Sequence, residues 1–147
     1  MIKTKPDKLP IGVRPSISTM IYDGDCGFCT YWINRWKTRT REKIHYISYQ
    51  ECGDQFSPLS EKEFQSSVFL ILPNGIFLSG AEAVFRSLAS NPFLSWISWI
   101  YRRIRLFQIL SESAYSFIAA NRNFFSKATI LFWGKNTEVP SYHISRW

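Results

Sequence analysis

The hydrophobic pattern divides the first third of the chain into a strand, a helix and a second strand. Residues 16–22 alternate and favour β-structure, and residues 43–49 do the same. Between them, residues 23–25 (Asp-Gly-Asp) predict a turn, after which large apolar residues recur every fourth position, at Phe28, Trp32 and Trp36. This order predicts a parallel βαβ unit with a right-handed crossover.

The middle of the chain predicts a β-hairpin. Two β-prone runs, 67–72 and 76–79, flank the turn residues Pro73-Asn74-Gly75. We therefore expect the last two strands of the sheet to be antiparallel.

Two helices are expected around this hairpin. A short one is predicted at 59–64. A second one begins after Ser79, which precedes Glu82 by three residues as in a capping box, and it ends at Asn91-Pro92. The predicted order is β-α-β-(α)-β-β-α.

Residues 93–110 predict one helix that is apolar apart from a narrow stripe at Ser95, Ser98, Arg102 and Arg105. Contact with a sheet alone cannot cover so much apolar surface. We expect this helix to pack between the sheet and a final helix near 114–120. The alternative is that part of it meets another protein or a peripheral membrane surface.

These elements predict an α/β fold of the thioredoxin-like type, with a small mixed sheet flanked by helices and with added C-terminal helices. We expect one domain at 17–135, a flexible N-terminal segment at 1–16 and an irregular tail at 136–147. A chain of 147 residues is long enough to bury a single core.

The net charge of +7 does not by itself indicate a nucleic-acid-binding protein. The basic residues do not clearly gather on one surface, and the main cluster runs past the end of the first predicted helix. The chain has neither the apolar core of a secretory signal near its start nor a run of about 18 apolar residues. We therefore expect a cytoplasmic protein that is soluble or membrane-peripheral and binds no nucleic acid.

Cys26 and Cys29 form a Cys-x-x-Cys pair at the predicted helix start. With Asp25 as the N-cap, Cys26 would be the first helical residue, where free backbone N–H groups stabilise a thiolate. Cys26 would attack a partner disulfide and Cys29 would resolve the mixed disulfide. Asp23 could accept the proton of Cys29, whereas the negative charges of Asp23 and Asp25 oppose thiolate formation at Cys26. For both carboxylates, turn and capping chemistry is an equally good interpretation.

Other interpretations of the Cys26–Cys29 pair stay open. Thr30 stands where covalent haem attachment requires a histidine. Four zinc ligands are conceivable, namely Cys26, Cys29, His45 and Cys52, although ordinary packing is the better interpretation for the last two. The pair could also be vestigial in a non-catalytic interaction module. We expect no cofactor and a protein or small-molecule disulfide or thiol as the partner.

The motif Asp23-x-x-Cys26-x-x-Cys29 after a strand resembles that of the DCC family of predicted thiol-disulfide oxidoreductases, which are similar to thioredoxins in fold. Segments 80–86 and 114–122 resemble later blocks of that family, so the resemblance covers about 19–127. It implies catalytic roles for Asp23, Cys26 and Cys29. Within the motif, Gly24, Asp25 and Gly27 are expected to support them.

The chain departs from ordinary thioredoxins at one point. In thioredoxins, a cis-proline before the third strand faces the disulfide. The matching stretch here is Gln65-Ser66-Ser67, without proline. We therefore expect substrate binding to differ from that of thioredoxin, or activity toward generic disulfides to be weak.

Overall fold

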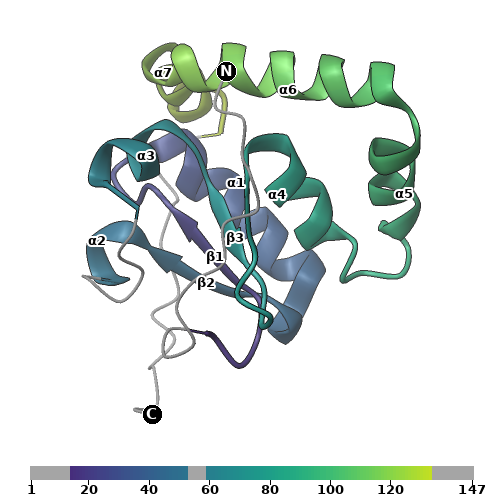
Figure 1. Ribbon diagram of the computed structural model, residues 1–147. Helices are drawn as coiled ribbons and strands as arrows, with labels where there is room; N and C mark the ends of the chain where they lie inside the picture. Colours follow the sequence, from purple (N-terminus) through teal and green to yellow (C-terminus); the bar gives the residue numbers. More distant parts are fainter. Residues whose placement is uncertain (1–13, 53–58, 134–147) are drawn as a thin grey trace.

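A four-stranded mixed sheet forms the centre of the protein (Figure 1). The computed structural model describes residues 14–52 and 59–133. The strands lie in the order β2-β1-β3-β4, with β1 and β2 parallel and β3 antiparallel to both β1 and β4. Their bounds are Thr19–Tyr22 for β1, His45–Ser48 for β2, Phe69–Ile71 for β3 and Phe77–Ser79 for β4. The predicted α/β fold, a small mixed sheet flanked by helices, is confirmed, and the arrangement is consistent with the thioredoxin-like type.

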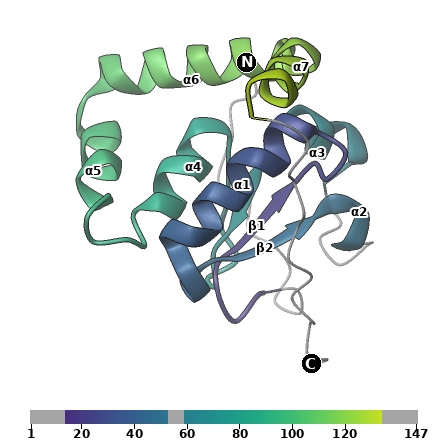
Figure 2. The same cartoon turned by 180° about the vertical axis from the view of Figure 1, so that it is seen from behind.

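The sheet carries a core on each face because side chains alternate along a strand. Met20 and Ile21 of β1 are both fully buried, and they belong to different core clusters. The Met20 cluster is covered by α1 (Gly27–Thr40) and α4 (Gly80–Leu88), and the Ile21 cluster by α2 (Tyr49–Cys52) and α3 (Glu61–Ser66) (Figures 1 and 2). A short 3-10 turn, η2 (Arg41–Lys43), connects α1 to β2.

The predicted hairpin is present between β3 and β4. Gly75 has a φ of 82°, which favours glycine, and its N–H donates to the carbonyl of Leu72 at 2.8 Å. Ile71 pairs with Phe77, so the turn residues close the hairpin as expected.

The start of α4 differs from the prediction. The Glu82 N–H, which the capping box would assign to Ser79, donates instead to the Glu112 carboxylate at 3.2 Å. Gly80 has a φ of 63°, and a Cβ there would lie 2.9 Å from Glu112 Oε2. The proposed Ser79–Glu82 capping box is therefore wrong, because a distant carboxylate takes its place.

The C-terminal part also differs. The single helix expected at 93–110 is two helices, α5 (Ser95–Arg103) and α6 (Arg105–Ala120), which meet at Ile104 in extended backbone. The final helix expected near 114–120 belongs to α6, and a further helix, α7 (Arg122–Trp133), was not predicted.

A ring of α4 explains the break between α5 and α6. The Phe85 ring packs against Tyr101 of α5 at 5.1 Å between centroids and against Phe107 of α6 at 5.7 Å. Tyr101 and Phe107 are six positions apart along the chain, and the break between them lets both rings reach the same partner.

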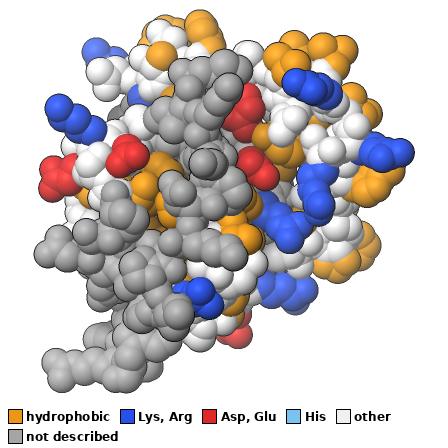
Figure 3. All heavy atoms as spheres, in the orientation of Figure 1, with side chains coloured by type: hydrophobic (Ala, Val, Ile, Leu, Met, Phe, Trp, Pro, Cys, Tyr) orange, Lys and Arg blue, Asp and Glu red, His pale blue; other side chains and the backbone are white. Residues whose placement is uncertain are grey.

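Helices α5, α6 and α7 form an outer helical layer over α1 and α4. Its α7 lies against α1, where Phe125 meets Phe28 at 5.8 Å, and α5 and α6 lie beside α4 (Figures 1 and 2). Hydrophobic and basic side chains are interspersed on its outside (Figure 3). Within the described residues, no helix is long and apolar enough to cross a membrane. The segments 1–16 and 136–147 lie largely or wholly outside the described residues, so their predicted character stays a prediction.

Candidate functional site

The two cysteines lie where β1 passes into α1. Cys26 is the N-cap of α1, and its Sγ accepts the N–H of Cys29 at 3.3 Å. The prediction that Asp25 is the N-cap is therefore wrong by one residue. The Asp25 N–H donates to Asp23 Oδ1 at 3.1 Å, and this local turn holds Asp25 just before the helix.

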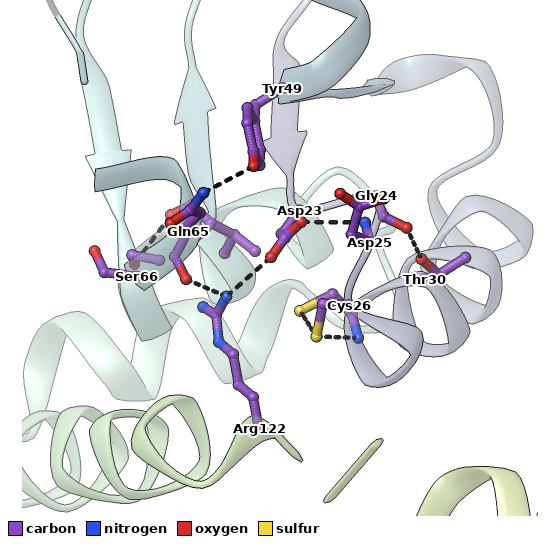
Figure 4. Close-up of polar contacts among 12 residues, drawn as sticks. Asp23, Gly24, Asp25, Cys26, Thr30, Tyr49, Gln65, Ser66 and Arg122 are labelled. Atoms are coloured by element: carbon purple, nitrogen blue, oxygen red, sulfur yellow. Dashed lines mark hydrogen bonds and ion pairs between the residues drawn. The ribbon is translucent and has the colours of Figure 1, made fainter. Parts of the chain in front are cut away.

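The two sulfurs form a hydrogen-bonded thiol pair. Cys29 is buried, whereas Cys26 is half-buried. The Cys29 thiol donates to Cys26 Sγ across 2.7 Å, a bond drawn as a dashed line in Figure 4. This bond is the main cause that lowers the pKa of Cys26 to about 7, against an opposing effect of burial. The same bond, followed by burial, strongly raises the pKa of Cys29. Cys26 therefore presents a thiolate near neutral pH while Cys29 keeps its proton.

Asp23 sits at the end of β1 and organises the turn before Cys26. Besides the Asp25 N–H, its Oδ1 accepts Gln50 Nε2 at 3.0 Å, and Gln50 Oε1 accepts the Gly24 N–H at 3.0 Å. A Cβ on Gly24 would lie 3.0 Å from Ser48 Cβ, so the turn packs tightly on β2. Gly27 is the first residue of α1.

Arg122, the first residue of α7, enters the site from the helical layer. Its guanidinium lies 3.9 Å from Asp23 Oδ2 and donates to the carbonyl of Gln65 (Figure 4). Its positive charge lowers the pKa of Cys26, whereas the charge of Asp23 raises it, and both effects are smaller than that of the Cys29 thiol. Arg122 was not among the site residues predicted from the sequence.

The segment that lacks the thioredoxin proline is held by the same layer. The Tyr115 hydroxyl of α6 accepts the Val68 N–H at 2.9 Å, directly before β3. Together with the Arg122 bond to Gln65, this contact fixes residues 65–68 from outside the sheet. All peptide bonds between described residues are trans. The stretch 65–67 therefore lacks the cis-proline of thioredoxin and is held in place by residues of α6 and α7.

The four ligands of the zinc hypothesis do not come together. His45 pairs with Thr19 at the end of the sheet opposite to Tyr22 and the cysteines, and Cys52 is buried in the core with Ile21 and Phe64. In the part of the chain that the structure describes, no three His, Cys, Asp or Glu side chains are placed to hold a metal ion. Packing, the preferred interpretation for Cys52, is confirmed.

A family model matches residues 20–128, about three quarters of the chain, under the description DCC1-like thiol-disulfide oxidoreductase. The chain belongs to this family. No curated protein and no solved structure matches it.

The matched range includes both cysteines, Tyr115 and Arg122. The match therefore covers α5, α6 and the first part of α7 as well as the sheet. The one sequence signal for Arg122 was its place in the 114–122 block of the resemblance. No local pattern could indicate that its side chain reaches Asp23.

Proposed function

We propose that the protein exchanges the Cys26–Cys29 dithiol with the disulfide of a partner protein or small molecule. The observation that carries this proposal is the lowered pKa of Cys26, to about 7, at the capped start of α1. A thiol with a pKa near the ambient pH combines a high thiolate fraction with good nucleophilicity. Membership of the DCC1-like family supports the same chemistry.

The first step is attack by the Cys26 thiolate on one sulfur of the partner disulfide. A bond forms between Cys26 Sγ and that sulfur, the partner S–S bond breaks, and the leaving sulfur departs as a thiolate that takes a proton from solvent. Cys29 keeps its proton at this stage because its pKa is strongly raised.

The second step requires Cys29 to lose that proton. Once Cys26 is bonded to the partner, it no longer carries the charge that holds the proton on Cys29. We assign the proton acceptor to Asp23, whose charge acts on both cysteines. The Cys29 thiolate then attacks Cys26 Sγ and releases the second partner thiol. The partner gains two electrons, and the protein is left with a Cys26–Cys29 disulfide that a dithiol donor must reduce.

Reduction of insulin disulfides with dithiothreitol as the donor tests this proposal. Cys26→Ser should abolish the activity, and Cys29→Ser should accumulate mixed disulfides visible by mass spectrometry without reductant. Cys52→Ala is the matched control, because Cys52 lies in the core away from the site. Activity of the Cys26→Ser protein equal to that of the unmodified chain would disprove the mechanism.

The reduction potential of the pair decides the direction of exchange. A strongly reducing value, near that of thioredoxin at about −270 mV, indicates a reductase, and a value near about −120 mV indicates an oxidase. Equilibration with glutathione buffers, followed by thiol counting, measures it.

A further inference from the structure

Helix α6 carries large apolar side chains on both its inner and its outer face. Its inner face sends Phe107 and Tyr115 toward α4 and β3. Its outer face carries Leu106, Ile109, Leu110 and Phe117, each 50% to 66% exposed. The two charged residues of this helix are Arg105 and Glu112, and Glu112 points inward to accept the hydroxyl of Tyr101 and the N–H of Glu82. Exposed apolar side chains that gather on one surface in this way are typical of a site that meets a partner or a membrane.

The neighbouring α5 adds exposed aromatic rings. Trp96 and Trp99 are 59% and 64% exposed, and Phe93 just before the helix is 86% exposed. Tryptophan is enriched at membrane–water interfaces, where its ring sits at the level of the headgroups. The exposed apolar surface therefore continues from α6 onto α5.

Arginines accompany this apolar surface at the α5–α6 junction. Arg102 and Arg103 end α5, and Arg105 begins α6. With Arg86 of α4, the first two line a cavity of about 500 Å³, whose other walls are Ala89, Ser95, Ser98 and Trp99. None of its lining residues is acidic. Among the described residues, none of these arginines has a carboxylate within ion-pair distance.

Glu82 is the acid that these arginines influence. Arg102 and Arg86 lower its pKa, but burial and the neighbouring Glu112 raise it by more. Among the described residues, the Glu82 carboxylate forms no ion pair with these arginines, so they remain available to an external anion.

We propose that the outer face of α5 and α6 docks on a membrane surface that contains anionic phospholipids. The arginines would bind headgroup phosphates, and one phosphate would lie in the cavity between α4 and α5. The exposed tryptophans and leucines would enter the headgroup region. A second copy of this chain fits less well, because a symmetric contact would bring the same arginines together without an acidic counterpart. The proposal is independent of the exchange chemistry, since none of these residues contacts the cysteines.

Co-sedimentation of the full chain with vesicles tests the proposal. We expect binding to vesicles of phosphatidylcholine with 30% phosphatidylglycerol at low salt, and at least roughly tenfold weaker binding to phosphatidylcholine alone, because each arginine near an anionic surface adds favourable free energy. Equal binding to both vesicle types, or binding to neither, would overturn the proposal.

Two sets of variants locate the docking face. Replacing Arg102, Arg103 and Arg105 with alanine should weaken binding to the anionic vesicles at least roughly tenfold. The matched control, Arg35→Ala with Arg39→Ala and Lys62→Ala, removes the same charge from exposed positions elsewhere and should change binding by less than about threefold. If the control weakens binding as much as the first set, the attraction is general and the proposed face is wrong.

Leu106→Glu with Leu110→Glu places charges on the apolar outer face without touching the core. This pair should also reduce vesicle binding roughly tenfold, with unchanged insulin reduction as the sign of a folded protein. Sedimentation velocity of the unmodified chain gives the decisive counter-result. A stable dimer that this pair dissolves would assign the face to a second copy and overturn lipid docking.

Discussion

The central sheet and the outer helical layer differ in how far their apolar side chains are buried. In the sheet, Met20, Ile21, Leu70 and Ile71 are almost completely buried. In the layer, α6 is longer than any strand or other helix described here, yet none of its residues is buried. Apolar residues thus build the core in one region, whereas in the other most of them stay at the surface.

Besides its aromatic contacts with α1 and α4, the layer makes polar contacts with the inner part of the protein. Glu112 accepts the N–H at the third residue of α4, Tyr115 holds the backbone before β3, and Arg122 reaches Asp23 beside the cysteines. The layer is therefore tied to the sheet, to α4 and to the site by specific polar contacts rather than by a second core. This contrast can be tested with substitutions that act on one region at a time.

The largest expected effect separates the regions by stability. Leu70→Ala in β3 should lower the free energy of unfolding by about 3 kcal/mol, because it leaves a cavity in a packed core. The same change at Leu110 in α6, where the side chain is 59% exposed, should cost less than about 0.5 kcal/mol. Urea denaturation followed by circular dichroism measures both. Equal losses would show that the layer is packed as tightly as the sheet.

A smaller effect is expected where the two regions are tied together. Tyr115→Phe removes the acceptor of the Val68 N–H and should cost about 1 to 2 kcal/mol, because this group is left buried without its partner. Tyr31→Phe removes a hydroxyl that accepts a surface bond from Arg35 and serves as the control, with an expected loss below about 0.5 kcal/mol. No difference between the two proteins would mean that this contact does not anchor α6.

The smallest effect concerns the thiolate. Arg122→Gln removes a positive charge that stabilises ionised Cys26, so the pKa of Cys26 should rise from about 7 by less than about one unit. Alkylation by iodoacetamide should then be slower below pH 7 and unchanged near pH 9, where Cys26 is ionised in both proteins.

Lys127→Gln in the same helix is the control for this charge. Its side chain is exposed, and it does not contribute to the pKa of Cys26. Peptide mapping after alkylation assigns the reaction to Cys26. If the pKa of Cys26 measured by alkylation is lower in Arg122→Gln, or rises equally in both variants, Arg122 does not support the thiolate.

The sheet could be predicted from the sequence because its signals are local. Alternation at 16–22, the turn at 73–75 and the apolar stripe of α1 each specify one element. The break at Ile104 has no such signal, since residues 102–106 contain neither proline nor glycine. It follows from Phe85, which receives one ring from each side of the break.

The site was predicted only in part, because only some of its residues have a local sequence signal. Cys26 and Cys29 were found through their spacing, and the helix start was placed one residue early because aspartate is the commoner cap. Arg122 donates to Gln65, which lies 57 positions away in the sequence. No periodic pattern in the sequence indicates a contact between residues so far apart. Contacts that depend on the placement of α7 become visible only with the structure.

The sulfur that caps α1 is also the proposed nucleophile, and the two tasks cannot be performed equally well at once. A thiolate is a strong acceptor for the Cys29 N–H, whereas a disulfide sulfur is a weak one. On the proposed mechanism, each oxidation would therefore weaken the cap and each reduction restore it. The first turn of α1 would open more often in the oxidised protein, so amide hydrogen exchange at Cys29 would report the redox state of the pair.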